Sequence, residues 1–318
     1  MLRASPAVVL PTMELLLVGL VLLAKTFPTT TTTTTTTTSS PLDAVPMVEV
    51  PLDLATTSFD DRYVGCAGAM DEELEDLNRT EFSTNGVYAQ AWTLAAAEWR
   101  SRRGRVPPVL RPEHAVALLA YTKHGPLFRA FNAAVREDGR SHRHYLDNFR
   151  FKAFHFLLSE ALRVLRGTRS SRCHRVYRGV HGIRFTARRH QRVRFGQFTS
   201  ASLREESALA FGRDTVFSVE TCYGVPIKDF SFYPEEDEVL IPPFEVFEVT
   251  DVTSGGGGAL IELRSRDADS AYNCEWVKER RCRDRPCDFG AGWSVRGDPS
   301  LLWGLLMVTT ALVATEGP

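Results

Sequence analysis

Two glutamates spaced two residues apart, Glu236 and Glu238, are the residues of this sequence best suited to chemistry. They belong to an acidic segment at 233–238 that leads directly into the apolar run 239–241. In an extended chain, side chains at positions i and i+2 point to the same side. Two carboxylates held close together repel, so a fold does not place them on one face merely to gain stability. A paired-carboxylate site is therefore one interpretation. A solvated acidic turn before a strand is the other.

The residues around this pair predict a β-sheet. Short runs rich in β-branched and aromatic residues, separated by Gly and Pro, recur through the second half of the chain. A glycine-rich turn is predicted at 255–258. The predicted strands are 175–180, 193–200, 215–222, 239–241, 244–252 and 259–263.

The first half predicts helices instead. Apolar residues recur at three- and four-residue spacing over 147–166, and Gly167 ends this helix. Residues 71–102 also have spaced apolar positions, and 114–122 is an apolar-rich segment. Helices followed by strands favour an α+β fold, mainly helical at 46–170 and mainly strands at 171–287. No G-x-G-x-x-G motif opens a helix, which disfavours a Rossmann domain.

Other polar residues have less specific interpretations. We expect His155, within the helix at 147–166, to be packed or hydrogen-bonded rather than catalytic. The basic cluster at 184–194 is interpreted as a solvated hairpin or loop, and a phosphate-binding role is the alternative. The formal net charge of −1 provides no electrostatic basis for nucleic-acid binding.

The two ends of the chain carry processing signals. The apolar run 15–23 predicts a signal peptide at 1–25, with Met13 as an alternative start. The threonine-rich segment at 26–45 is interpreted as a low-complexity linker, either an O-glycosylated spacer or a neutral repeat. Small residues, a polar spacer and the apolar run 301–313 predict a GPI-attachment signal at 288–318. A disordered or core-packed C-terminal segment is the alternative.

Cysteine usage agrees with export. Six cysteines are present, and an even number in an exported chain favours disulfides, although six allow fifteen pairings. A zinc site is the alternative, but no histidine lies near Cys282 and Cys287, so we expect no metal. Asn78 begins an N-glycosylation sequon.

Three short segments of the second half occur in a recognisable order. They are 177–180 with Arg178, 196–203 with Ser200 and Ser202, and 236–243 with the two glutamates. An arginine, a serine-rich strand end and a Glu-x-Glu resemble the R-S-E signature of mono-ADP-ribosyltransferases. The closest resemblance is to the arginine-specific ecto-ADP-ribosyltransferases of vertebrates. It extends over nearly the whole globular region through the segments 58–61, 131–136 and 178–182. Ala201 departs from the family pattern, which has threonine between the two serines.

The resemblance implies an ADP-ribosyltransferase fold and a reaction. The family transfers ADP-ribose from NAD or NADP to a protein arginine and releases nicotinamide. By this resemblance Arg178, Ser200 and Glu238 are catalytic, with Glu238 stabilising the positive charge that develops on the ribose. Glu236 would position the acceptor arginine and help to remove its proton.

The resemblance also implies further contacts. Tyr121, Gly179, Gln197 and Ser231 are candidates for cofactor binding together with Arg178, although Tyr121 could equally be a core aromatic. Residues 230–238 would form a target-recognising turn, with Phe232 or Tyr233 exposed to the target protein. The family pattern pairs Cys66 with Cys274 and Cys173 with Cys222. Pairing of Cys282 with Cys287 is an open possibility.

The sequence thus predicts an exported enzyme at the cell surface, GPI-anchored or secreted. Its expected partners are NAD and arginine-bearing proteins, with no nucleic acid and no metal. It would be a monomer that contacts the membrane through a lipid anchor only. Two other functions stay open: an NAD glycohydrolase, which uses water as acceptor, and a non-catalytic surface binding module.

Overall fold

The computed structural model describes residues 47–102, 110–168, 173–255, 258–283, 287 and 289. The predicted signal peptide and the threonine-rich linker lie outside these residues, and so does the predicted GPI-attachment signal apart from Phe289. Among the helices described, none has the length and apolar content needed to span a bilayer.

The first half of the domain is helical, as predicted. Asn85 divides the helix expected at 71–102, because its Oδ1 accepts a hydrogen bond from the backbone N–H of Tyr88 at 3.1 Å and so caps a second helix. The helix expected at 147–166 begins only at Lys152, and α4 was not predicted as a helix. The helices are α1 (Ala67–Thr84), α2 (Gly86–Arg102), α3 (Pro112–Thr122), α4 (Pro126–Glu137), α5 (His142–Asn148), α6 (Lys152–Gly167), α7 (Glu205–Leu209) and α8 (Glu275–Arg281).

The second half forms a large sheet with the strand order β4-β9-β10-β6-β2-β5-β8-β7. Its neighbours are antiparallel except β10 and β6, which are parallel. Separately, β1 pairs with β3 in parallel. The strands are β1 (Val48–Pro51), β2 (His174–Val180), β3 (Ile183–Thr186), β4 (Arg192–Val193), β5 (Thr199–Ser202), β6 (Thr215–Thr221), β7 (Val225–Pro226), β8 (Glu238–Ile241), β9 (Glu245–Gly255) and β10 (Gly258–Ala268).

The single strand predicted at 193–200 is two strands at different places in the sheet. β4 is an edge strand beside β9, whereas β5 lies between β2 and β8. The chain leaves β4 through Gly196, whose φ of +66° lies in the left-handed region. A Cβ on Gly196 would lie 2.4 Å from the Cβ of Ala55, so the turn requires glycine.

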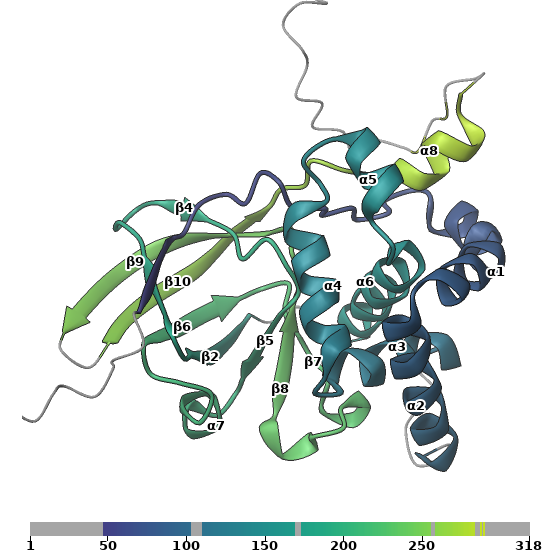
Figure 1. The fold of residues 1–318 in the computed structure, drawn as a ribbon. Helices are drawn as coiled ribbons and strands as arrows, with labels where there is room; N and C mark the ends of the chain where they lie inside the picture. The colour runs from purple at the N-terminus through teal and green to yellow at the C-terminus, as the bar shows by residue number, and fades with distance from the viewer. Residues whose placement is uncertain are drawn as a thin grey trace, which may run out of the picture. The chain divides into compact units, whose positions relative to one another are not determined.

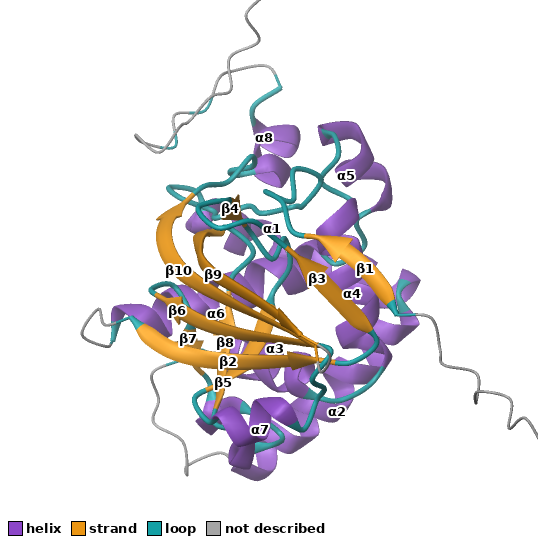
Figure 2. Cartoon of the chain, turned by 90° about the vertical axis from the view of Figure 1, so that its left-hand side faces the viewer, coloured by secondary structure: helices purple, strands orange, loops and turns teal. Residues whose placement is uncertain are grey.

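Helices and sheet pack as an α+β domain, which confirms the predicted fold class (Figure 1). Helices α1–α6 gather on one side of the strands, and Figure 2 shows the strands in front of these helices. Buried apolar residues within the described ranges form two clusters. Leu240 of β8 belongs to the cluster formed with the helices, whereas Val239 and Ile241 belong to the cluster within the sheet. Alternate residues of β8 therefore face different cores.

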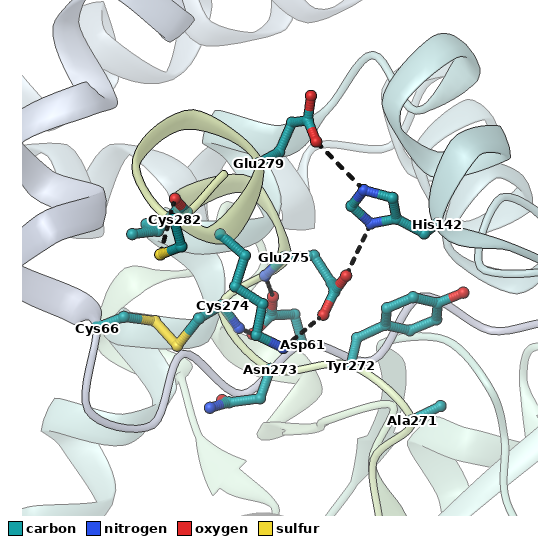
Figure 3. A network of polar contacts seen from close by, with 12 residues as sticks. Asp61, Cys66, His142, Ala271, Tyr272, Asn273, Cys274, Glu275, Glu279 and Cys282 are labelled. Carbon is teal, nitrogen blue, oxygen red and sulfur yellow. Dashed lines mark hydrogen bonds and ion pairs between the residues drawn. A yellow bond between two sulfur atoms is a disulfide. The ribbon is translucent and has the colours of Figure 1, made fainter. Parts of the chain in front are cut away.

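The beginning and the end of the domain are joined by a network of polar contacts (Figure 3). The buried Asp61 carboxylate accepts hydrogen bonds from the backbone N–H groups of Tyr63 and Cys274 at 2.8 Å and of Glu275 at 2.9 Å. Burial raises the pKa of Asp61 to about 6 despite these bonds. His142 of α5 lies 2.8 Å from Glu275, so α8 is held to α5 as well.

The two disulfides implied by the family pattern are present. Cys66 is bonded to Cys274 across 208 residues, and Cys173 is bonded to Cys222 across 49 residues. Cys282 is bonded to Cys287, the pairing that the sequence left open.

Two expectations about polar residues have different outcomes. His155 is packed, as expected: its Nδ1 lies 2.8 Å from the Tyr63 hydroxyl, and burial lowers its pKa to about 3. The solvated-loop interpretation fits 188–190, which are exposed, but is wrong for Arg194. Arg194 is buried, forms an ion pair with Asp60 and donates to the carbonyl of Leu54 at 2.7 Å. It therefore fixes the N-terminal segment to the sheet.

Candidate active site

The neighbouring strands β5 and β8 position the two residues at the centre of the candidate site. Glu238 begins β8 opposite Ser202, and Ser200 lies opposite Leu240. Since residues two apart on a strand share a face, Ser200 and Glu238 lie on the face that Leu240 turns toward the helices. The Glu238 side chain is buried there, at 5% exposure.

Arg178 reaches this site from β2. The ladder between β2 and β5 contains a single register pair, Tyr177 with Ser202. Arg178 Nη1 donates to the carbonyl of Ser200 at 2.7 Å. Burial lowers the pKa of Arg178, and the nearby Tyr121 and Glu238 oppose this change. A guanidinium thus lies next to the buried carboxyl group.

The electrostatics of Glu238 link these residues. Its pKa is raised to about 7, mainly by burial and also by the charge of Glu236. Hydrogen bonds from the hydroxyls of Ser200 and Ser231 and the charge of Arg178 act in the opposite direction. The predicted Arg178, Ser200, Glu236 and Glu238 therefore lie close enough to interact, although they come from three separate segments of the chain.

Glu236 reaches Glu238 by a different route from the one expected. Pro234–Glu236 is a 3₁₀ turn, and Asp237 has a left-handed backbone with φ of +45°. The premise of an extended chain at 236–238 is therefore wrong. The turn is held by the Ser202 hydroxyl, which donates to the Glu236 carbonyl at 2.6 Å. Asp237 forms an ion pair with Lys228 at 2.6 Å.

His124, which sequence reasoning missed, lies beside Glu236. Its Nε2 is 3.9 Å from Glu236 Oε1. Its ring stacks on Tyr233, with ring centres 4.2 Å apart and an angle of 20° between the rings. Burial raises the pKa of Glu236, and His124 partly opposes this rise. His124 is in the loop between α3 and α4, where no motif of the sequence pointed to it.

Tyr121 lies beneath the site. It is buried, and its hydroxyl donates to the carbonyl of Phe198 at 2.9 Å and accepts from Asn132 Nδ2 at 3.1 Å. Burial raises the pKa of Tyr121, and a hydrogen bond with Ser200 partly opposes this rise. Tyr121 therefore contacts Ser200 from within the buried part of the domain. A direct contact between Tyr121 and the cofactor stays a prediction.

The other three candidates for cofactor contact also have local partners. A Cβ on Gly179 would lie 2.3 Å from the carbonyl oxygen of Gly212, so close packing of β2 explains this glycine. Gln197 Oε1 accepts a hydrogen bond from Arg136. Ser231 is buried, and its hydroxyl accepts from the backbone N–H of Tyr233 at 3.0 Å.

The arrangement provides a buried acid, a second and less buried acid, a guanidinium and hydroxyl groups. A buried carboxylate stabilises a cation that develops beside it more strongly than a solvated one does. A guanidinium binds anionic oxygens such as those of phosphate. In the described part of the chain, no three His, Cys, Asp or Glu side chains come together as metal ligands.

Comparison with known proteins defines the class to which this site and fold belong. The model of the NAD:arginine ADP-ribosyltransferase family matches residues 52–271, and the chain belongs to this family. The resemblance seen in the R-S-E segments is thereby confirmed.

Individual relatives agree. The erythroblast NAD(P)(+)--arginine ADP-ribosyltransferase of Gallus gallus is 56% identical over 248 residues, which cover 77% of this chain and 82% of that protein. The GPI-linked NAD(P)(+)--arginine ADP-ribosyltransferase 1 of Homo sapiens is 49% identical over 286 residues, with coverages of 85% and 88%.

Solved structures show the same fold. The mono-ADP-ribosyltransferase ART2.2 superposes with a TM-score of 0.62 at 38% identity, covering 71% of this chain and 98% of that one. A mutant of ART2.2 in complex with NAD gives the same TM-score and identity.

Proposed function

We propose that this chain transfers ADP-ribose from NAD to arginine side chains of proteins. The observation that carries the proposal is the buried Glu238 carboxyl, with Arg178 and Ser200 beside it, in a member of the NAD:arginine ADP-ribosyltransferase family. In the reaction, the bond between the ribose and the nicotinamide nitrogen breaks, and nicotinamide leaves with both bonding electrons. A guanidinium nitrogen then bonds the same ribose carbon and loses a proton.

Glu238 acts at the ribose. Positive charge develops on the sugar as nicotinamide departs, and a carboxylate fixed beside it stabilises the transition state more than the ground state. With a pKa of about 7, Glu238 of the free chain is partly protonated at neutral pH. The positive charge of the bound nicotinamide ring favours the carboxylate form, because an opposite charge lowers the pKa of an acid.

Glu236 acts at the acceptor. An arginine guanidinium is always protonated in water and is therefore a poor nucleophile. Glu236 lies near Glu238 but is less buried, which suits a group that meets an incoming protein side chain. It binds the guanidinium and takes up its proton during the attack.

Arg178 binds a phosphate of NAD, since it has N–H groups beyond the one that donates to Ser200. Ser200 and Ser231 orient Glu238 through their hydroxyl groups. Tyr121, Gln197 and Gly179 shape the wall around them. The turn at 230–238, with Phe232 and Tyr233 partly exposed, meets the target protein.

We also propose that the mature chain is exported and held at the cell surface by a GPI anchor. The predicted signals at 1–25 and 288–318 and the GPI-linked human relative support this localisation. Release of the protein from cells by a phosphatidylinositol-specific phospholipase is the test. Glycosylation at Asn78 and a monomeric state are part of the same proposal. The Oδ1 of Asn78 accepts from the Tyr88 hydroxyl at 2.8 Å, and this bond leaves Nδ2, the atom that N-glycosylation modifies, unused.

The test of the enzymatic function compares three glutamate variants in an assay with labelled NAD and an arginine analogue. We expect Glu238→Gln to lower both transfer and NAD hydrolysis by about 10²–10³-fold, the loss typical when an electrostatic catalytic group is removed. Glu236→Gln should lower transfer by about tenfold or more while hydrolysis continues. The exposed neighbour Glu235 serves as the matched control, because Glu235→Gln should change neither rate.

Each outcome separates the alternatives. Full turnover by Glu238→Gln would show that the site is elsewhere. Unchanged transfer by Glu236→Gln would contradict its role at the acceptor. A wild-type protein that hydrolyses NAD without modifying the arginine analogue is an NAD glycohydrolase, and one that does neither is a binding module.

A further inference from the structure

A cavity of about 500 Å³ lies at the other end of β8 from Glu238. Its walls come from four segments: the C-terminal half of α6, residues 62–64, the turn after β6, and the residues after β8. Along β8, Glu238 and Ile241 are separated by about 10 Å of extended chain, and Pro242 of the cavity follows Ile241. The cavity, which we name the α6 pocket, is therefore separate from the candidate active site.

Three arginines line the α6 pocket, and they differ in their partners. Arg163 is neutralised by Glu160, with Nη2 and Oε2 2.7 Å apart. The side chains of Arg62 and Arg166 form no ion pair or hydrogen bond with any residue in the described ranges, and each contacts an aromatic ring there. The lining residues contain no Asp or Glu. Two positive charges of this pocket thus lack a counter-charge in the described structure.

Aromatic rings hold these two guanidiniums in place. The guanidinium carbon of Arg62 lies 4.9 Å from the ring centre of Phe244, and that of Arg166 lies 4.2 Å from the ring centre of Tyr223. The two rings contact each other edge to face, with centres 5.6 Å apart. A ring face attracts the cation but accepts no conventional hydrogen bond from the N–H groups at the edge of the guanidinium. These N–H groups therefore stay free to bind an oxyanion. Two such groups fixed beforehand reduce the entropy lost on binding.

We propose that the α6 pocket binds a phosphate monoester, with the phosphate on Arg62 and Arg166 and the apolar part of the ligand against Leu162 and Pro242. A guanidinium binds phosphate oxygens through two parallel hydrogen bonds. The cavity volume falls within the range of small-molecule sites. The site does not depend on the transferase activity proposed above.

The position of the α6 pocket bears on where such a phosphate comes from. Val64 lines the pocket, and the next residue, Gly65, lies against the backbone of Phe289, near the C-terminal end of the domain. A chain held at a membrane through its C-terminus would have this face near the lipid headgroups. A soluble phosphorylated molecule and a lipid headgroup present the same chemical group, so the experiment includes both.

The test uses phenyl phosphate as the probe, titrated into the mature protein by calorimetry with a non-hydrolysable NAD analogue at saturation. We expect saturable binding that the analogue does not displace. Arg62→Gln/Arg166→Gln should weaken it about tenfold or more, because the charge-assisted hydrogen bonds to the anion are lost. Arg188→Gln/Arg189→Gln removes two exposed arginines elsewhere and should leave binding unchanged. A thermal unfolding transition like that of the wild type shows that the double variant is folded. If the double variant does not fold, each single variant should still weaken binding.

Vesicles distinguish the two sources. Phosphatidylcholine vesicles that contain phosphatidic acid should bind the wild-type protein, in competition with phenyl phosphate, if the source is a lipid. They should bind no better than pure phosphatidylcholine if the ligand is soluble. The proposal is overturned if wild-type protein shows no saturable binding of phenyl phosphate, if the double variant binds it equally well, or if the NAD analogue displaces it.

Discussion

Replacing the buried acid of the candidate active site should stabilise the domain while greatly lowering its activity. Glu238 has an ordinary pKa of 4.5 when unfolded and a pKa of about 7 in the folded chain, mainly because of burial. Below the unfolded pKa, both states are protonated and the shift costs nothing. As the pH rises from 4.5 to 7, the unfolded state loses its proton first, so the free energy of unfolding falls.

The magnitude follows from the shift. Each pKa unit corresponds to about 1.36 kcal/mol, so ionised Glu238 lowers the free energy of unfolding by about 3 kcal/mol above pH 7. This figure already includes the attraction of Arg178, which is one cause of the folded-state pKa. Glutamine resembles the protonated acid in shape and hydrogen bonding. Glu238→Gln should therefore recover about 3 kcal/mol at pH 8 and less than about 1 kcal/mol at pH 5.

The assay is thermal unfolding of both proteins at the two pH values. For a domain of this size, about 3 kcal/mol raises the Tm by about 6–12 °C. The Tm difference between variant and wild type should be large at pH 8 and small at pH 5. Glu235→Gln, at an exposed position, should show no such difference. A variant that unfolds at or below the wild-type Tm at pH 8 would refute the reasoning, and so would a Tm difference independent of pH.

Two further predictions concern the acceptor side of the site and the disulfides. His124→Ala removes the ring that stacks on Tyr233 and lies next to Glu236, so the KM for an arginine analogue should rise by about threefold or more while the rate of NAD hydrolysis stays within about twofold. An equal loss of both activities would mean that His124 serves the fold. His190→Ala, at an exposed ion pair with Glu248, is the control. Replacing both cysteines by serine should cost about 5 kcal/mol for Cys66–Cys274 and about 4 kcal/mol for Cys173–Cys222, because the longer loop loses more entropy on closure. Urea denaturation measures both, and the reverse order would contradict this account.

Periodicity was sufficient for several regular elements. The helix at 152–167 and the strands around Val176 and Phe217 have regular apolar spacing, and the structure contains them. The boundaries that failed depend on single residues with local functions. Asn85 caps a helix inside an apparently continuous helical pattern, and Gly196 turns the chain inside an apparently continuous strand. Periodicity carries no information about such points.

For the site, the R-S-E segments identified residues that the structure brings together, although the geometry assumed for the glutamates was wrong. The pair meets through a 3₁₀ turn and a left-handed Asp237, a conformation that spacing alone does not reveal. His124 was missed because its neighbour Glu236 is 112 positions away in the chain. Long-range neighbours of this kind become visible only when the fold places two loops side by side.

The bond between Cys66 and Cys274 has a consequence for any form of the protein cut near its C-terminus. It joins the last part of the domain to the start of α1. A cut after Phe289 would leave both this bond and the hydrogen bonds of Asp61 to Cys274 and Glu275 within the released domain. Cys274 is therefore tied covalently to the residue before α1, and neither end of this link lies on β5 or β8, the strands that carry Ser200 and Glu238. Shedding by a protease at that point should liberate a domain whose catalytic geometry is intact.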